Sequence, residues 1–148
     1  MTKNYDKGVT MKKKIFYTKK CVPPTPSYSQ AVIHNGIAYI SGQLSLDLEG
    51  NILHGTVAEQ THNILKNVKV LAEELGGTLD DVLSTSFYFA DNTVFPEFDK
   101  VYRQYFPNNP PARVATISKE IYGGLALEMS AIIAVDEDKI PKENILTP

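Results

Sequence analysis

The sequence predicts one α+β domain in which two helices cover the same face of a β-sheet. Its 148 residues are enough to enclose a single apolar core without metal ions or disulfides. Strands and helices are expected in the order ββ(β)αβαββ, and each helix carries one apolar stripe. Because both stripes need an apolar partner, we expect the two helices to share one face of the sheet.

The chain is predicted to hold its folded domain between two polar ends. Residues 1–13 lack periodicity, so we expect a disordered arm there, and Met11 is a second possible start of translation. The domain spans 14–136 and opens with a short strand over 14–18. The polar, proline-containing segment 137–148 is interpreted as a loose tail.

A hairpin is predicted early in the domain. Prolines within 21–27 exclude regular structure from that segment. Strands follow over 30–34 and 37–41, and the Asn-Gly dipeptide at 35–36 joins them. Asn-Gly suits a two-residue hairpin turn because both positions tolerate a positive φ angle.

The longest predicted helix begins at Thr56. Thr56 and Glu59 form a capping box, in which each side chain satisfies a backbone N–H at the helix start. The Gly76-Gly77 pair ends the helix, since glycine readily adopts the left-handed conformation. The residues predicted to face the core recur at helical spacing: Val57, Ile64, Leu65, Val68, Leu71, Ala72 and Leu75.

The second half of the domain is predicted to contain three more strands and one helix. The strands cover 82–90, 112–118 and 125–135, and the helix covers 93–106. Four side chains of the first of these strands are predicted to share one side: Leu83, Thr85, Phe87 and Phe89. Four side chains of the helix are predicted to be buried: Phe98, Val101, Tyr102 and Tyr105.

The composition argues against several classes of function. The net charge of −2 provides no positive field for nucleic acid or an anionic membrane. Apolar runs fall short of the roughly 20 residues that cross a bilayer. Cys21 is the only cysteine, which excludes an internal disulfide and suits a reducing cytoplasm. We therefore expect a cytoplasmic protein with no membrane partner and no nucleic-acid partner.

A metal site and a phosphate loop are not predicted either. The three histidines, His34, His54 and His62, do not have the spacing of a metal-binding set. The glycine pairs at 76–77 and 123–124 fit turns better than a phosphate-binding loop.

Arg113 and Glu128 are the main candidates for a functional site. Each is the only charge in an otherwise uncharged segment. Burying a lone carboxylate costs free energy unless it is paired with another group or has a functional role. An unpaired guanidinium can bind both oxygens of a small carboxylate through two of its N–H groups. The two together predict a site for a small organic acid. The plain structural alternative for Arg113 is an ion pair with a nearby surface carboxylate.

Five short segments carry a recognisable combination of residues: Tyr28-Ser29-Gln30, Ser41-Gly42-Gln43, Glu59-Gln60-Thr61, Pro111-Ala112-Arg113 and Leu127-Glu128-Met129. Their order and spacing over about 15–135 resemble the RidA family, the reactive intermediate (imine) deaminases also called YjgF-like proteins. The fifteen positions between Arg113 and Glu128 (128 minus 113) match the spacing of that family.

The resemblance implies a chorismate-mutase-like fold that assembles as a homotrimeric barrel. Sheets would line the centre, helices would lie outside, and a site would occupy each cleft between subunits. Members of the family hydrolyse 2-imino acids such as 2-iminopropanoate and 2-iminobutanoate to 2-keto acids and ammonia. The resemblance implies no metal and no organic cofactor.

The resemblance also implies roles for three catalytic residues. Arg113 would hold the substrate carboxylate through two parallel hydrogen bonds. Glu128 would orient a water molecule toward the imine carbon and transfer protons. Tyr28 would help to hold that water molecule or the substrate.

Four further residues are implied in substrate binding. Backbone groups of Gly42 and Ala115 would donate or accept hydrogen bonds, and Ser41 would form part of the wall. Asp99 stands where many members carry asparagine and would add negative charge to the cleft if it points inward. Two other departures are Ala115, where many members carry cysteine, and Thr116, where an aliphatic residue is usual.

Two other functions stay open on the sequence. One is a trimeric ligand-binding module that senses small carboxylates and regulates a partner. The other is the ribonuclease activity ascribed to some relatives as translation inhibitors, against which the acidic net charge argues. A deaminase for another imine, such as an aminomuconate, fits the same chemistry.

Overall fold

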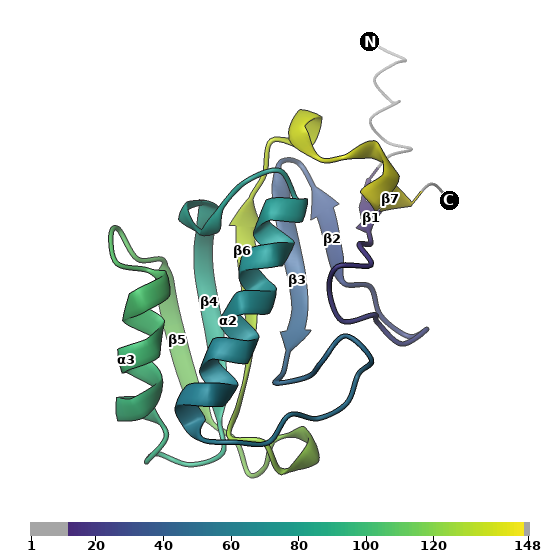
Figure 1. The fold of residues 1–148 in the computed structure, drawn as a ribbon. Coiled ribbons are helices and arrows are strands. Elements are labelled where there is room, and N and C mark those ends of the chain that lie inside the picture. The colour runs from purple at the N-terminus through teal and green to yellow at the C-terminus, as the bar shows by residue number, and fades with distance from the viewer. Residues whose placement is uncertain (1–11, 147–148) are drawn as a thin grey trace.

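The computed structural model describes residues 12–146, whose centre is one seven-stranded sheet in the order β5-β4-β6-β3-β2-β1-β7 (Figure 1). The strands are β1 (Lys14–Phe16), β2 (Ala31–His34), β3 (Ile37–Gln43), β4 (Val82–Phe89), β5 (Ala112–Ile117), β6 (Leu127–Ala134) and β7 (Ile145–Leu146). Only the pairing of β4 with β5 is parallel among the described strands, so the sheet is mixed. The predicted disordered arm lies almost wholly outside the described residues.

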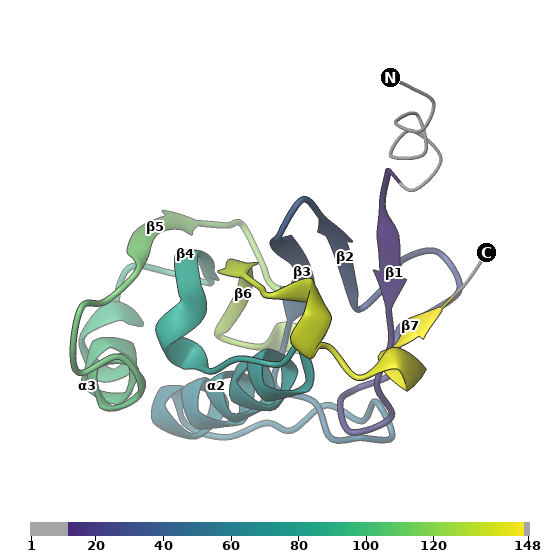
Figure 2. The same cartoon turned by 90° about the horizontal axis from the view of Figure 1, so that it is seen from above.

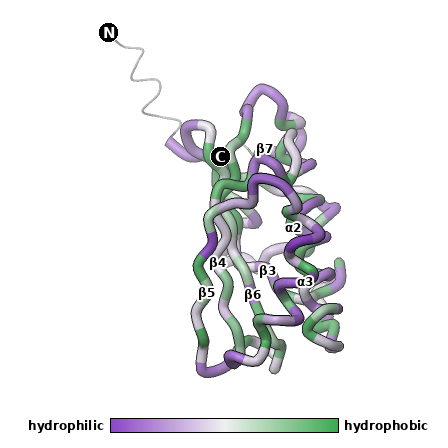
Figure 3. The backbone as a smooth tube through the Cα atoms, turned by 90° about the vertical axis from the view of Figure 1, so that its left-hand side faces the viewer, coloured by the Kyte–Doolittle hydropathy of each residue, from purple (hydrophilic) through white to green (hydrophobic). Residues whose placement is uncertain are grey.

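Two helices, α2 (Val57–Glu74) and α3 (Phe95–Tyr105), lie on one side of this sheet. Figure 2 shows both helices beneath the row of strands, and Figure 3 shows the sheet and the helices as two layers seen edge-on. The predicted α+β class, with a mixed sheet and two helices on one face, is therefore confirmed. The hairpin of β2 and β3 turns at Asn35 and Gly36, both with positive φ angles, as the Asn-Gly dipeptide predicts.

The ends of α2 follow from the residues that occupy them. The Thr56 side chain accepts a hydrogen bond from the Glu59 backbone N–H at 3.1 Å, and the Glu59 carboxylate accepts one from the Thr56 backbone N–H at 2.8 Å. This capping box satisfies two N–H groups that the helix cannot pair internally. At the other end, Gly76 has a φ angle of +88°, which only glycine adopts without strain.

The core fills the space between the two layers. The largest fully buried side chains come from the sheet, from α2 and α3, and from two positions next to these elements (Leu75 and Leu125): Phe16, Ile33, Ile64, Leu65, Leu71, Leu75, Phe87, Phe98, Leu125, Leu127, Met129 and Ile133. Phe98 of α3 meets Phe87 of β4 edge-to-face, with ring centroids 4.5 Å apart. This aromatic contact attaches α3 to the strand that neighbours β5.

Leu83 is a residue for which the predicted orientation is wrong. The pairing of β4 with β6 shifts register between Val82 and Ser84, and Leu83 is exposed whereas Thr85, Phe87 and Phe89 are buried. A bulge of this kind changes the side to which a residue points. A prediction that assumes strictly alternating side-chain directions along the strand does not account for such a bulge.

The segment after Asp136 is packed against the domain, so the prediction of a loose tail is wrong for the residues that are described. The Glu137 carboxylate accepts hydrogen bonds from the Gly36 backbone N–H and from Lys14, each at 2.8 Å. Asn144 is buried, and β7 pairs with β1. These contacts extend the sheet by one strand beyond β1.

The face of the sheet opposite the helices is left uncovered by residues 12–146. Tyr39, Tyr88 and Val114 are among its exposed side chains, with 49%, 39% and 57% of their surface accessible. An uncovered apolar sheet face is typical of an interaction surface. Separately, no helix within 12–146 is both long enough and apolar enough to cross a membrane.

Candidate functional site

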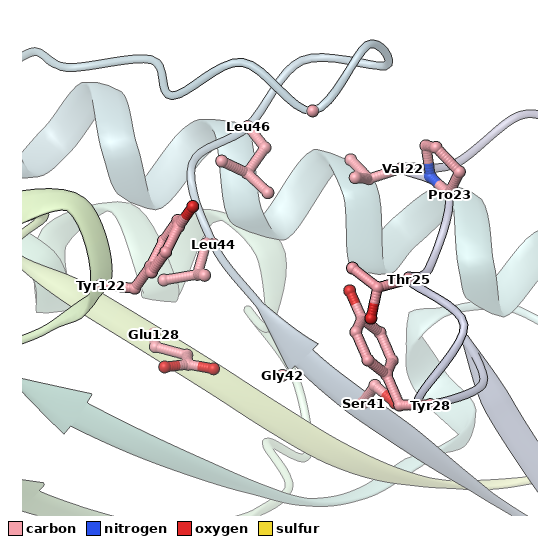
Figure 4. A pocket seen from close by; sticks show the side chains of 11 residues that line it. Val22, Pro23, Thr25, Tyr28, Ser41, Gly42, Leu44, Leu46, Tyr122 and Glu128 are labelled. Atoms are coloured by element: carbon pink, nitrogen blue, oxygen red, sulfur yellow. The ribbon is translucent and has the colours of Figure 1, made fainter.

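A cleft of about 580 Å³ opens where β3 and β6 meet the loops before β2 and before β6 (Figure 4). Figure 4 shows Glu128 and Tyr122 on one side and Tyr28 on the other, with Gly42 between them. The cleft is lined by Val22, Pro23, Thr25, Tyr28, Ser41, Gly42, Leu44, Leu46, Gly50, Tyr122 and Glu128. Four of the seven predicted site residues therefore share one cavity.

Glu128 is the charged group of this cleft. Its neighbours along β6, Leu127 and Met129, are buried toward the helices, so Glu128 points from the opposite face. Burial raises the pKa of the Glu128 carboxyl, and no hydrogen bond or ion pair joins it to another described side chain. A carboxylate that is partly desolvated and unpartnered can still accept a proton or a hydrogen bond from a ligand.

Gly42 provides the room that Glu128 needs. A Cβ atom at position 42 would lie 2.2 Å from Oε2 of Glu128, far inside van der Waals contact. A register shift between Ile40 and Gln43 places Gly42 at this point of the strand. The strand is irregular at Gly42, and its backbone lies against the carboxylate.

The loop that carries Tyr28 is fixed by a buried glutamine. The Gln30 side chain donates to the backbone carbonyls of Thr18 and Val22 at 3.0 and 2.9 Å and accepts from the Thr18 N–H at 2.7 Å. The Ser41 hydroxyl donates to the carbonyl of Ser29. Tyr28 itself stays about half exposed at the mouth of the cleft, where its hydroxyl can meet a ligand.

Gln60 in α2 secures the start of β6. Its amide nitrogen donates to the Gly55 carbonyl at 3.0 Å, and its amide oxygen accepts from the Ala126 N–H at 2.8 Å, two residues before Glu128. The neighbouring Thr61 hydroxyl donates to the Val57 carbonyl at 2.7 Å. The Glu-Gln-Thr segment therefore caps the helix and anchors the strand that holds the cleft carboxylate.

Arg113 lies in a different place, on the side of the sheet that carries the helices. Its guanidinium carbon is 4.6 Å from the ring centroid of Tyr102, 5.5 Å from that of Phe98 and 5.3 Å from that of Phe95. These distances are within the range of cation–π attraction. Burial raises the pKa of Tyr102, so at neutral pH the guanidinium rests on an uncharged ring.

Asp99 is the partner of Arg113. Oδ1 of Asp99 accepts a hydrogen bond from Nη1 of Arg113 at 3.0 Å, and Oδ2 accepts one from Nε of Arg103 at 2.9 Å. The plain structural alternative for Arg113, an ion pair with a nearby carboxylate, is therefore present. The expectation of an unpaired guanidinium is wrong. Asp99, Arg103 and Arg113 line a hollow of about 320 Å³ beside α3.

Arg113 and Glu128 are not brought together within one chain. Arg113 is paired with Thr85, whose side chain is buried beneath the helices, and Glu128 is paired with Tyr88, which points to the uncovered face. Residues three apart on a strand face opposite sides. Within one chain the two charges therefore do not lie beside each other, so the prediction of a shared site applies only to a cleft between subunits. One chain presents a carboxylate half-site and a guanidinium half-site.

Ala115 lies on β5, the strand at one edge of the sheet. It follows Arg113 by two residues, so its side chain points to the same face. The outward backbone groups of an edge strand lack partners in their own sheet. These groups are available to a ligand or to another chain.

Two other chemistries are not supported by the described residues. Within 12–146, no group of three or more histidine, cysteine, aspartate or glutamate side chains is arranged to hold a metal ion. Burial raises the pKa of Cys21 to about 12, so its thiol stays protonated at neutral pH and is a poor nucleophile.

Sequence reasoning missed the apolar part of the cleft wall. Tyr122, which is 67% exposed, lines the same cavity as Glu128, and so do Leu44 and Leu46 (Figure 4). No motif predicts that Tyr122 lines the cleft, because its position depends on the Gly123-Gly124 turn, where both glycines have positive φ angles. Leu44 and Leu46 lie one and three residues after Ser41-Gly42-Gln43. This closeness to the motif is the only feature of the sequence that places them near the cleft.

Comparisons with known proteins identify the family and the fold of this chain. The model of the family described as Endoribonuclease L-PSP matches residues 18–135. A RutC family protein of Pyrococcus abyssi is 35% identical over 123 residues, which cover 82% of this chain and 97% of that protein. The crystal structure of yeast Mmf1 superimposes with a TM-score of 0.80 at 29% identity and covers 84% of this chain and 99% of that one.

A second similar structure is that of RidA from an Antarctic Psychrobacter, with a TM-score of 0.76 at 29% identity, covering 81% of this chain and 98% of that one. The match of the family model over most of the chain and the similarity to the archaeal relative lead to the same assignment. The chain belongs to the Endoribonuclease L-PSP family, the RidA and YjgF group that includes the RutC proteins.

Proposed function

We propose that this protein is a cytoplasmic deaminase that hydrolyses small 2-imino acids, such as 2-iminobutanoate and 2-iminopropanoate, to 2-keto acids and ammonia. The observation that carries the proposal is the pair of half-sites. The cleft holds a carboxylate without a partner, and β5 presents a guanidinium that is positioned but has donors left. A 2-imino acid needs both groups, one near its carbon–nitrogen bond and one at its carboxylate.

Completion of the site requires a second copy of the chain. The two half-sites lie on opposite faces of one sheet, so no side-chain rearrangement within that chain can join them. The uncovered face carries exposed apolar side chains that a neighbouring subunit would bury. We propose a homotrimer in which Arg113 of one subunit faces the Glu128 cleft of the next.

The proposed reaction begins with substrate placement. Arg113 holds the substrate carboxylate, and backbone groups at Gly42 and Ala115 orient the rest of the molecule. Glu128 accepts a proton from a water molecule while the water oxygen bonds to the imine carbon, which gives a carbinolamine. The same carboxyl then returns the proton to nitrogen. Glu128 then moves the hydroxyl proton to the nitrogen, and the carbon–nitrogen bond breaks as the carbon–oxygen double bond forms, so that ammonia leaves.

The raised pKa of Glu128 suits this exchange, because burial makes its carboxylate a stronger proton acceptor than a fully solvated one. Tyr28, at the mouth of the cleft, is proposed to hold the attacking water or the substrate. Ser41 supports the wall from beneath through its bond to the Ser29 carbonyl.

A coupled assay tests the proposal. A threonine dehydratase generates 2-iminobutanoate, semicarbazide competes for it, and the protein is scored by its suppression of semicarbazone. We expect Arg113→Ala to lower kcat/KM at least about 100-fold, because the loss of a bidentate carboxylate anchor removes the orientation of the substrate.

Lys100→Ala serves as the matched control, since it removes an exposed cation from α3 without touching the Arg113 contacts. It should behave as wild type. If wild-type protein fails to suppress semicarbazone, imine deamination of this substrate is wrong. If Arg113→Ala keeps full activity in an assembled protein, the role of Arg113 is wrong.

RNA cleavage, the activity that the family description names, is less compatible with the cleft. None of its lining residues is a lysine or an arginine, and its single charged group is the Glu128 carboxylate. Phosphate recognition depends on cations and on N–H donors. We therefore favour a small carboxylate as the ligand.

A further inference from the structure

We propose that Asp99 and Arg103 set the strength with which Arg113 holds its carboxylate ligand, so that this protein binds substrate and product more weakly than it would with an uncharged partner in the place of Asp99. The inference rests on the proposed function, since it concerns the same half-site. It assigns Asp99 as a positioning and affinity-setting residue and gives Arg103 a role that no motif suggests.

The three side chains form one chain of contacts. Asp99 bridges Nη1 of Arg113 and Nε of Arg103, with separations of 3.0 and 2.9 Å. The Asp99 side chain is 14% exposed, that of Arg113 26% and that of Arg103 79%. The contact between Asp99 and Arg113 is therefore only partly exposed to water, whereas Arg103 lies on the solvent side of the cluster.

The bridge leaves the recognition edge of Arg113 open. Asp99 occupies Nη1, and within the described residues no hydrogen bond reaches Nε or Nη2. These two atoms form one edge of the guanidinium and can bind both oxygens of a carboxylate. The rings of Tyr102 and Phe98 support the plane of the group, and Asp99 stops its rotation within that plane. Asp99 therefore positions the free edge.

The same bridge reduces the positive charge that a ligand meets. Two guanidinium groups and one carboxylate give the cluster a net charge of +1, counted as two minus one. A substrate carboxylate on the free edge of Arg113 stands near the Asp99 carboxylate, which repels it across a partly desolvated site. Positioning strengthens binding and the charge of Asp99 weakens it, so different substitutions can separate the two effects.

Weaker binding has a use in this reaction. The 2-imino acid and the 2-keto acid carry the same carboxylate, so each added increment of affinity for that group also retains the product. Binding that is uniform through the reaction lowers KM without raising kcat. A guanidinium whose charge is partly offset therefore allows faster product release while it keeps its orientation.

The experiment changes the net charge of the cluster by substitution and measures both KM and the Kd for 2-ketobutanoate in each variant. Asp99→Asn keeps an oxygen that can accept from Nη1 and raises the cluster charge to +2, whereas Arg103→Gln lowers that charge to zero. We expect Asp99→Asn to lower KM and the Kd for 2-ketobutanoate about 3- to 10-fold, and Arg103→Gln to raise both by a similar factor, with kcat changed less than 2-fold. Asp99→Ala also loses the positioning contact and should raise KM.

Glu97→Gln and Lys100→Gln are the controls, because they change charge on the same helix without touching the cluster. If Asp99→Asn leaves both constants unchanged or raises them, or if Asp99→Asn and Asp99→Ala shift them in the same direction, the inference is overturned. Binding of 2-ketobutanoate in the predicted order without any turnover would reject deamination but keep the inference. Absence of binding in every variant and in wild type would overturn both.

Discussion

The two half-sites of this protein differ in how many side-chain partners their charged group already has. Glu128 stands in an open cleft with no side-chain partner among the described residues, and burial raises its pKa. Arg113 lies across aromatic rings and shares Asp99 with a second arginine. The carboxylate is kept reactive and the guanidinium is kept rigid. This division suits a proton-transfer group and a substrate anchor respectively.

Mixed assemblies of two inactive variants test whether the half-sites belong to one working site. Arg113→Ala and Glu128→Gln are each expected to lose at least about 100-fold in kcat. In a cyclic assembly with random mixing of equal amounts, a site regains both groups with a probability of one half times one half. We therefore expect about a quarter of wild-type activity after the two chains are co-refolded.

The control is each variant refolded alone, which should stay inactive. Recovery that fails to appear, although the mixed assembly forms, would show that one chain supplies both groups or that the two groups do not cooperate. Separate affinity tags on the two variants identify the mixed species.

Gly42→Ala addresses the carboxylate half-site alone. The added methyl group would lie 2.2 Å from Oε2 of Glu128, so the carboxylate must move away from its position in the cleft. We expect kcat to fall about 10-fold, which is within the loss that follows from misplacing one catalytic group. The melting temperature should change little, because Gly42 has no positive φ angle and the colliding atom ends a flexible side chain.

A double-mutant comparison isolates the cause. In a Glu128→Ala background, the carboxylate that the methyl group displaces is absent, so Gly42→Ala should cause no further loss of kcat. An equal loss in both backgrounds would assign another role to Gly42.

The smallest expected effect is the change in stability, as opposed to activity, that Glu128→Gln causes. The folded protein raises the pKa of Glu128 above its unfolded value of about 4.3, so folding favours the protonated form. The stability that Glu128 contributes is thus fully present below the unfolded pKa and is lost as the pH rises through the folded one. At pH 7 the glutamine variant should be more stable by less than about 1 kcal/mol, because solvent screens the charge.

Thermal denaturation measured from pH 3 to pH 8 checks this sign. The difference in melting temperature should be positive at pH 7 and should approach zero below about pH 4. A glutamine variant that is less stable at pH 7 would mean that the folded protein stabilises the ionised carboxylate. Lys100→Gln again controls for a general effect of surface charge.

The local parts of the fold could be predicted because local residues determine them. The capping box at Thr56 and Glu59, the Asn-Gly turn and the glycine end of α2 are each set by neighbouring residues. The bulge that exposes Leu83 and the packing of the chain end against β1 depend on pairing partners far away in the sequence. Periodicity in one segment holds no information about those partners.

The same distinction applies to the candidate site. Tyr28, Ser41, Gly42 and Glu128 were expected together, and one cleft contains all four. The separation of Arg113 from them follows from two pairing registers, Thr85 with Arg113 and Tyr88 with Glu128, which no motif specifies. The bridge through Asp99 requires α3 and β5 to be adjacent, so it too could not be derived from spacing alone.

The parallel register of β5 has a consequence for protein engineering. The segment 106–111 links α3 to this strand, and its length decides whether Arg113 or Ala112 is turned toward the helices. Removing or adding a single residue there would exchange the two faces while every side chain of the cleft stayed unchanged. A library that varies loop length should therefore hold this connection constant, since a shift of one position would disable the anchor without unfolding the domain.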